Sequence, residues 1–503
     1  MEAMSFKTWF AKQWARRVRA RVAREQKNAL ALQLRTFHRL VQRAAHTAFG
    51  RDHHFDLIRT YEQFRTHVPV RDYEAMRPWL DRVYGGEEDI TWEGKPIYLA
   101  KTSGTTSGAK YIPLSRESMQ NQVKAARDAL LMHIANTGNA GFLGGKMMFL
   151  SGSPVLDTNA HGMKVGRLSG IVNHFVPAYL QRNRVPGFAT NSIEDWEEKV
   201  TQIVKEIKGE DLRLISGIPP WVQMLFEELN RQTGKQPLEV WPNLQVFVQG
   251  GVNFQPYKPI FDAYFGDKVS LIETFPASEG FFAFQDTVQS IGMHLMPDNG
   301  IFFEFIPVEE YGRSDARRLW LGEVVAGQSY ALIVSTNAGL WAYDIGDVVR
   351  FESVNPWRVR VVGRVKHFIS AFGEHVIGEE VEYALMAAVE ATGAEVAEFT
   401  VAPLVVEQKG ESAHEWLIEF SKAPESLPAF SLALDNALRK KNVYYEDLRA
   451  GNILRQAVVT LLKPYATREY MKAEGKLGGQ NKFPRLTNDR KVADALYPFR
   501  LKA

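Results

Sequence analysis

The segment 102–110 gathers hydroxyl side chains around a glycine and ends in a lysine. Hydroxyl and backbone N–H groups beside a cation are the donors that bind phosphate oxygens. The glycine spacing, G-x-x-x-G-x-K, differs from that of a Walker loop, and Pro113 disfavours a helix directly after the lysine. We therefore expect a phosphate-binding loop of another kind, between strands at 96–101 and 110–114. Its candidate residues are Thr102, Ser103, Gly104, Thr105, Thr106, Ser107 and Lys110.

Lys110 itself leaves two interpretations open. It could support the loop or contact a pyrophosphate, or it could be an ordinary solvated strand lysine.

Two further strands are expected to end in glycine or polar turns, where α/β proteins bind ligands. Gly250 and Gly251 follow the strand expected at 244–249, and their missing side chains would let a flat base pack closely. Glu279 lies in the polar segment 274–280, after the strand expected at 269–273. Its carboxylate could hold Mg²⁺ on a triphosphate, or it could be an ordinary exposed acid.

A fourth candidate is Asp347, which stands between Gly346 and the apolar strand that follows. A short acid at the mouth of a strand could accept hydrogen bonds from both hydroxyls of a ribose. The alternative is a turn aspartate in a hairpin.

The helices and strands expected to position these groups follow a different pattern in different parts of the chain. Up to about residue 300, helices alternate with short apolar strands, which predicts α/β layers. One helix is well signalled after 115, with Ser115 as its N-cap. From 301 short strands separated by turn residues predict an antiparallel or barrel-like subdomain, and the elements after 363 predict a small α+β domain. The expected fold class is thus α/β, with a large N-terminal domain at 1–362 and a small C-terminal domain at 363–503.

Composition excludes several classes. The 503 residues carry a net charge of only +3, which gives no reason to expect nucleic acid as a partner. The absence of cysteine excludes disulfides, zinc–thiolate sites, iron–sulfur clusters and thiol nucleophiles. No apolar run is long enough to span a bilayer, so we expect a cytoplasmic protein.

The basic residues concentrate between Lys7 and Arg43, where Glu25 is the single acid. Apolar residues there lie near helical spacing, which predicts one or two amphipathic helices. They could contact a membrane surface or a polyanion. A core-facing helix with a solvated basic face is the interpretation we favour.

In their order and contexts, these motifs resemble the adenylate-forming superfamily, and most closely its acyl-acid amido synthetases, known from auxin and jasmonate conjugation. The resemblance runs from about residue 69 to 485. It includes the phosphate loop, a second motif at 274–279, a third at 343–349, a hinge at Gly363-Arg364 and a late lysine motif at 479–485. Phe275 stands where the second motif usually has a tyrosine.

The resemblance implies ATP and Mg²⁺ as cofactors and a two-step reaction. A carboxylate would attack the α-phosphate and expel pyrophosphate, and the amine of an amino acid would then take the acyl group. The C-terminal domain would be mobile and bring Lys482 to the α-phosphate. The implied catalytic residues are Lys482 and Glu279, with Glu279 on the metal. The implied nucleotide-binding residues, besides the loop, are Gly250, Gly251, Thr274, Phe275, Ser278, Glu279, Tyr343, Asp347 and Arg364.

The carboxylic acid is expected to lie beside the helix after the loop and the segment 169–179. Its candidate contacts are Ser118, Gln122, Arg127, Ser169 and Tyr179. Two alternatives remain: an enzyme that passes the adenylate to coenzyme A or a carrier thiol, and a catalytically silent protein that binds nucleotide or acid as a sensor.

Overall fold

The computed structural model describes residues 6–102, 110–175, 182–251, 254, 257–288, 290–365, 368–369, 371–372, 374, 376–406, 411–451, 453–478 and 481–501. Contacts along the chain divide it into two compact units. The first contains Met1–Ile345 and Val349–Val361, and the second contains Gly346–Val348 and Val362–Ala503. Within the described residues, no helix has the length and apolar character needed to cross a membrane.

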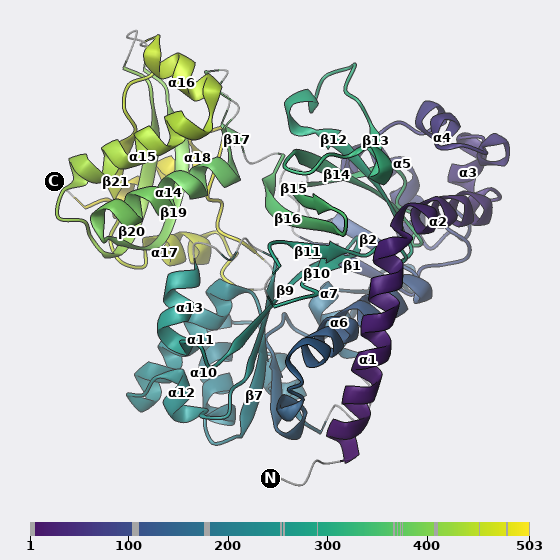
Figure 1. Cartoon of the computed structure of the whole chain (residues 1–503), viewed down its shortest axis with the longest axis horizontal. Coiled ribbons are helices and arrows are strands. Elements are labelled where there is room, and N and C mark those ends of the chain that lie inside the picture. Colours follow the sequence, from purple (N-terminus) through teal and green to yellow (C-terminus); the bar gives the residue numbers. More distant parts are fainter. Residues whose placement is uncertain are drawn as a thin grey trace. The chain divides into compact units, whose positions relative to one another are not determined.

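Most elements of the first unit are labelled in Figure 1. Its helices are α1 (Phe6–Lys27), α2 (Ala29–Ala44), α3 (Ala48–Asp52), α4 (Tyr61–His67), α5 (Tyr73–Tyr84), α6 (Arg116–Thr137), α7 (Leu168–Asn173), α9 (Phe188–Asn191), α10 (Trp196–Ile207), α11 (Pro219–Thr233), α12 (Pro237–Val240) and α13 (Lys258–Phe265). Its strands are β1 (Tyr98–Thr102), β2 (Lys110–Leu114), β3 (Lys146–Phe149), β4 (Asp157–Thr158), β5 (Lys164–Gly166), β6 (Arg184–Val185), β7 (Leu212–Ser216), β8 (Val246–Gly250), β9 (Ser270–Ala277), β10 (Gly280–Phe284), β11 (Met293–Leu295), β12 (Ile301–Pro307), β13 (Leu319–Trp320), β14 (Ser329–Thr336), and most of β15 (Tyr343–Val354) and of β16 (Trp357–Arg364).

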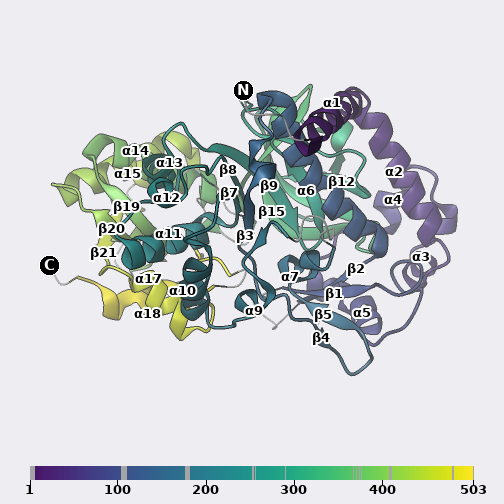
Figure 2. The same cartoon turned by 90° about the horizontal axis from the view of Figure 1, so that it is seen from below.

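The main sheet has the order β13-β12-β14-β15-β16-β11-β10-β9-β8-β7-β3-β6. Strands β6, β3, β7, β8 and β9 run parallel, and their side chains alternate between two covered faces. Val246 packs with α1 and α6, whereas the ring of Phe247 stacks 4.9 Å from that of Phe261 on α13. Figure 2 shows α10–α13 on one side of these strands and α1 and α6 on the other. This is the predicted α/β layering.

The short strands after residue 301 are antiparallel, as predicted. Together with β10 and β11, they belong to the same twelve-stranded sheet as the parallel strands. The parallel and antiparallel regions are therefore one continuous hydrogen-bonded sheet. A separate four-stranded sheet, β2-β1-β5-β4, carries the β1–β2 hairpin.

The predicted N-cap of α6 is confirmed, because the Ser115 hydroxyl accepts a hydrogen bond from the Ser118 N–H. Helix α1 packs along α6 and buries Ala11, Ala15, Val18 and Val22 against it and the sheet. The predicted core-facing packing of the basic N-terminal segment is therefore correct for this face of α1.

Helix α2 docks onto the sheet through one buried amide. The Gln33 Nε2 group donates to the carbonyls of Pro297 and Ile301, each at 2.9 Å, and its Oε1 accepts from the Phe303 N–H at 2.9 Å. Every polar atom of this amide group is thus satisfied by backbone far along the chain.

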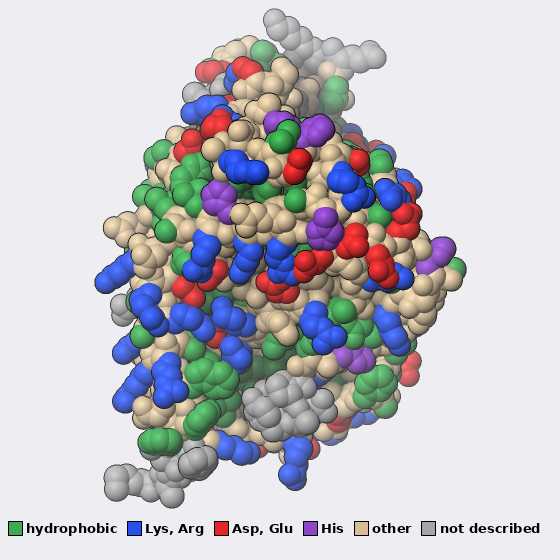
Figure 3. Space-filling model, turned by 90° about the vertical axis from the view of Figure 1, so that its right-hand side faces the viewer, with side chains coloured by type: hydrophobic (Ala, Val, Ile, Leu, Met, Phe, Trp, Pro, Cys, Tyr) green, Lys and Arg blue, Asp and Glu red, His purple; other side chains and the backbone are tan. Residues whose placement is uncertain are grey.

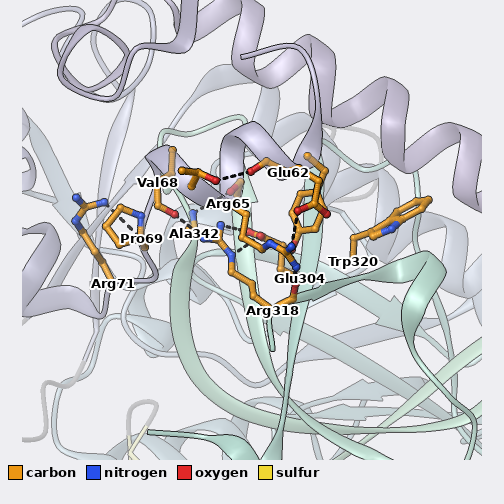
Figure 4. A network of polar contacts seen from close by, with 12 residues as sticks. Glu62, Arg65, Val68, Pro69, Arg71, Glu304, Arg318, Trp320 and Ala342 are labelled. Atoms are coloured by element: carbon orange, nitrogen blue, oxygen red, sulfur yellow. Dashed lines mark hydrogen bonds and ion pairs between the residues drawn. The ribbon is translucent and has the colours of Figure 1, made fainter. Parts of the chain in front are cut away.

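A buried ion pair lies beneath α4 (Figure 4). Arg318 donates from Nε and Nη2 to the two carboxylate oxygens of Glu304, at 2.5 and 3.0 Å, and from Nη1 to the Val68 carbonyl. Beyond Val68 the chain pairs with β15, since the Arg71 N–H donates to Ala342 and the Asp344 N–H donates to Arg71. The ion pair therefore anchors the segment that leads to α5.

The second unit contains β17 (Phe368–Ile369), β18 (Val376–Ile377), α14 (Gly378–Thr392), β19 (Glu395–Leu404), β20 (Ala413–Lys422), α15 (Leu427–Lys441), α16 (Val443–Ala450), β21 (Val458–Leu461), α17 (Ala466–Ala473) and α18 (Lys491–Leu496). The sheet β19-β20-β21 packs against α14 and α15, with Trp416 and Phe430 fully buried between them. The predicted α+β character is confirmed.

Replacing Glu304 by Gln leaves the buried Arg318 charge uncompensated. We expect the variant to lose about 3–5 kcal/mol of unfolding free energy, the cost of breaking a buried pair. Chemical denaturation followed by tryptophan fluorescence measures it. The matched control is Asp315→Asn, which breaks the exposed Arg313–Asp315 pair and should change stability little. Equal losses in the two variants would contradict the anchoring role.

Candidate active site

Two of the phosphate-loop candidates, Thr102 and Lys110, lie at the ends of the β1 and β2 strands. Thr102 and Lys110 are directly paired at the end of the ladder, so the loop leaves and re-enters the sheet at one position. The predicted pair of strands is confirmed, and the next helix begins only at Arg116. Ser103, Gly104, Thr105, Thr106 and Ser107 lie outside the described residues.

Tyr73, at the start of α5, supports the hairpin. Its hydroxyl accepts a hydrogen bond from the Tyr111 N–H at 3.0 Å, and the Lys110 ammonium lies 5.5 Å from the centre of its ring. Burial raises the pKa of the Tyr73 hydroxyl. Lys110 is therefore held against an aromatic face at the mouth of the loop.

Glu279 lies in a tight turn. We predicted a polar turn across 274–280, but β9 continues to Ala277, which pairs with Gly280 at the start of β10. Ser278 and Glu279 alone make the connection, because pairing with β10 extends the strand beyond its apolar part. The half-buried Glu279 carboxylate is thus fixed at the tip of a two-residue hairpin.

Gly250 is required by the close approach of β8 and β9. A Cβ atom there would lie 2.4 Å from the Thr274 carbonyl oxygen, and the Thr274 hydroxyl donates to Gln249 at 3.0 Å. Gly251 has a φ of +83°, which favours glycine. Phe275 is only 5% exposed and packs edge-on against Phe282, with ring centres 4.9 Å apart. Its ring therefore offers little surface to an adenine.

Tyr343 brings these groups together. Its pKa is raised well above the usual value, first by burial and then by the charge of Glu279, with Tyr73 as a further contributor. Its backbone bridges to Arg71, two residues before Tyr73. The mouth of the phosphate loop, the Glu279 turn and the start of β15 therefore converge.

Asp347 and Arg364 lie in the second unit and form an ion pair of 2.8 Å. Desolvation lowers the pKa of Lys482, the Arg364 guanidinium lowers it further, and the Asp347 carboxylate raises it. The three side chains thus lie within electrostatic range of one another. The resemblance assigned all three to the nucleotide, and the structure places them together.

The residues predicted to contact the carboxylic acid do not all lie in one place. Gln122 is buried on α6 and donates to the Ala277 carbonyl at 2.9 Å, beside the Glu279 turn, and Ser118 lies one turn earlier with its hydroxyl bonded to Ser115. Arg127 is not with them, because its guanidinium lies 4.7 Å from the centre of the Trp14 ring on α1. Ser169 accepts from the Gly152 N–H at 3.2 Å, after β3, and Tyr179 lies outside the described residues.

One candidate was missed. Lys199 on α10 is 1% exposed, and its ammonium donates to the carbonyls of Ser151 and Asn191 at 2.9 and 2.6 Å. Burial, with the nearby Arg167 as a second cause, lowers its pKa from 10.5 to about 8. The signal was present in the sequence, since Lys199 occupies an inward position among Trp196, Val200 and Ile203. The Lys199 ammonium therefore lies just beyond the carboxyl end of β3.

The arrangement also fits a single divalent cation. No group of three or more His, Asp or Glu side chains that could hold a metal occurs among the described residues. Glu279 alone provides a carboxylate at the turn, which suits Mg²⁺, an ion bound by one or two carboxylates together with substrate phosphates.

The fold is that of adenylate-forming enzymes. A solved structure of the AtGH3.15 acyl acid amido synthetase in complex with 2,4-DB is similar, with a TM-score of 0.78 at 18% identity over 97% of this chain and 96% of that one. A 2-hydroxyisobutyryl-CoA ligase in complex with 2-HIB-AMP has a TM-score of 0.58 at 14% identity, covering 93% of this chain and 90% of that one.

Within that fold class, the chain belongs to the GH3 family. Models of the GH3 N-terminal, central and C-terminal domains match residues 18–183, 294–364 and 379–491. The 4-substituted benzoates-glutamate ligase GH3.12 of Arabidopsis thaliana is 24% identical in an alignment that covers 86% of this chain and 89% of that protein. For three of the curated relatives, the matched share of the relative's own length is 61%, 73% and 89%.

The pKa of Lys199 generates a pH prediction. Between pH 8 and 10.5 the unfolded chain keeps this proton while the folded chain loses it, so wild-type stability should rise relative to Lys199→Met across that window. The rise should total about 3 kcal/mol. Chemical denaturation at several pH values measures it, with Lys205→Met, an exposed position on the same helix, as the control. A difference that stays flat with pH would contradict the buried charge.

Proposed function

We propose that this protein is an ATP-dependent ligase that joins a small carboxylic acid to the amine of an amino acid through an acyl-adenylate. The observation that carries the proposal is the convergence at Tyr343 of the phosphate-loop mouth and the Glu279 turn. The family's named members, such as the benzoate–glutamate ligase, support the choice of an amino acid as acceptor.

The first step needs positioning and charge neutralisation, since a carboxylate and a triphosphate repel each other. One carboxylate oxygen would bond to the α-phosphorus while the bond to pyrophosphate breaks. Thr102 and the loop hydroxyls would donate to the phosphates, with Lys110 beside them. Mg²⁺, held by Glu279 and phosphate oxygens, would neutralise phosphate charge.

In the second unit, Asp347 and Arg364 would bind the ribose, and Lys482 would neutralise the α-phosphate. Lys482 is exposed, and its ammonium lies within electrostatic range of the Arg364 guanidinium, so it gains when an anion arrives, which suits this role. We also propose a role for each part of the chain. Residues 1–362 would bind ATP and the acid, and residues 363–503 would form a mobile lid that carries Lys482. The amine would then attack the acyl carbon, and AMP would leave.

A second candidate acceptor is coenzyme A, because one of the similar folds is that of a CoA ligase. Mass spectra of products made with mixed amino acids and coenzyme A together distinguish an amide from a thioester. We expect the amide.

Carboxylate-dependent ATP–pyrophosphate exchange tests the first step across aryl, indolyl and fatty acids. We expect exchange with at least one acid and a roughly 100- to 1,000-fold loss in Lys482→Ala, the range for removing a group that stabilises transition-state charge. The matched control is Lys476→Ala, an exposed lysine in the same segment that pairs with Glu474. Unchanged exchange in Lys482→Ala would contradict its role, and no exchange with any acid would favour a nucleotide- or acid-binding sensor.

Glu279→Gln tests the metal position in the same assay. Losing the carboxylate should raise the Mg²⁺ concentration needed for half-maximal exchange roughly tenfold or more, while the neutral amide preserves the hairpin turn. Glu273→Gln, on strand β9 and within electrostatic range of Arg360, serves as the control. Equal Mg²⁺ requirements in wild type and Glu279→Gln would remove Glu279 from the metal site.

A further inference from the structure

Helix α1 has a second face, on the side away from its buried residues. Trp9, Gln13, Arg16 and Ala20 follow one another at spacings of three or four residues, so they lie on one side of the helix. This side is opposite the buried positions Ala11, Ala15, Val18 and Val22. We call it the outer face of α1.

The outer face exposes both charge and aromatic surface. Arg16, Arg17, Arg24 and Lys27 are exposed along it. At its N-terminal end Trp9 is 46% exposed and the neighbouring Phe10 is 55% exposed. In Figure 3 the Lys and Arg side chains gather along the left flank, over α1, with hydrophobic side chains at the lower end.

Acidic groups are turned away from this face. Glu25, the single acid of α1, is paired with Arg21 at 3.2 Å, and Arg21 also contacts the buried Asp128 of α6. No ion pair joins Arg16, Arg17 or Lys27 to any carboxylate that the structure describes. The positive charge of the outer face is therefore not offset within it.

The outer face of α1 also borders a hollow. Trp9, Phe10, Trp14, Arg16 and Arg17 contribute to the lining of a hollow of about 620 Å³. Two further aliphatic side chains are exposed on α2, where Leu30 is 38% exposed and Leu34 is 37% exposed. The exposed Trp9 and Phe10 rings and the guanidinium groups beside them on α1 match the boundary between phospholipid headgroups and acyl chains.

We propose that the outer face of α1 binds the surface of a membrane rich in anionic phospholipid, with Trp9 and Phe10 at the headgroup boundary and Arg16 and Arg17 on the lipid phosphates. This binding is compatible with the core packing of α1, because the two use opposite faces. A duplex polyanion such as double-stranded RNA would satisfy the charge but would leave the Trp9 and Phe10 rings in water, so a bilayer is the better match.

Vesicle flotation of the full chain tests the proposal, using phosphatidylcholine vesicles with and without phosphatidylglycerol. We expect flotation only with the anionic vesicles and release by high salt. Arg16→Glu/Arg17→Glu and, separately, Trp9→Ala/Phe10→Ala should each lower the bound fraction about tenfold. The matched control is Lys205→Glu/Lys208→Glu, the same charge change at exposed positions on and just after α10, and it should bind as wild type does.

Circular dichroism and ATP–pyrophosphate exchange without vesicles should be unchanged in all these variants, which separates lost binding from lost folding. Absence of flotation with anionic vesicles would overturn the proposal. So would wild-type binding by Trp9→Ala/Phe10→Ala, or an equal loss in the Lys205/Lys208 control, since either would reduce the interaction to general charge attraction.

Discussion

The site of the first unit depends on one buried ion pair. Glu304 and Arg318 are withdrawn from water, where desolvation offsets much of their attraction, so their value is chiefly geometric. Arg318 holds the Val68 carbonyl, and the chain after it pairs with β15 before Tyr73 reaches the β1–β2 hairpin. The mouth of the phosphate loop and Tyr343 are therefore positioned from the same anchor.

Local signals in the sequence were sufficient for much of the fold. The Ser115 cap and the two strands around the loop depend on neighbours within a few residues. The extension of β9 to Ala277 could not be predicted this way. It depends on pairing with β10, which outweighs the turn character of the segment.

In the candidate site, too, some features could be predicted from the sequence and others could not. The motif pattern identified Glu279, Asp347, Arg364 and Lys482, and the structure places the last three together. It could not reveal that Arg127 would turn towards Trp14, because α1 lies more than a hundred residues earlier. Nor could it identify Lys199 as a cation at the end of β3, since its partners are backbone carbonyls contributed by other segments.

The buried amide of Gln33 has a consequence for synthesis of the chain. Its partners Pro297, Ile301 and Phe303 leave the ribosome about 270 residues later, and at about 5–20 residues per second this interval is roughly 15–50 s. During that time α2 can form as a helix but cannot complete its docking. The nascent N-terminal segment must keep its apolar side covered by other means, which makes it a natural client for chaperones at the ribosome.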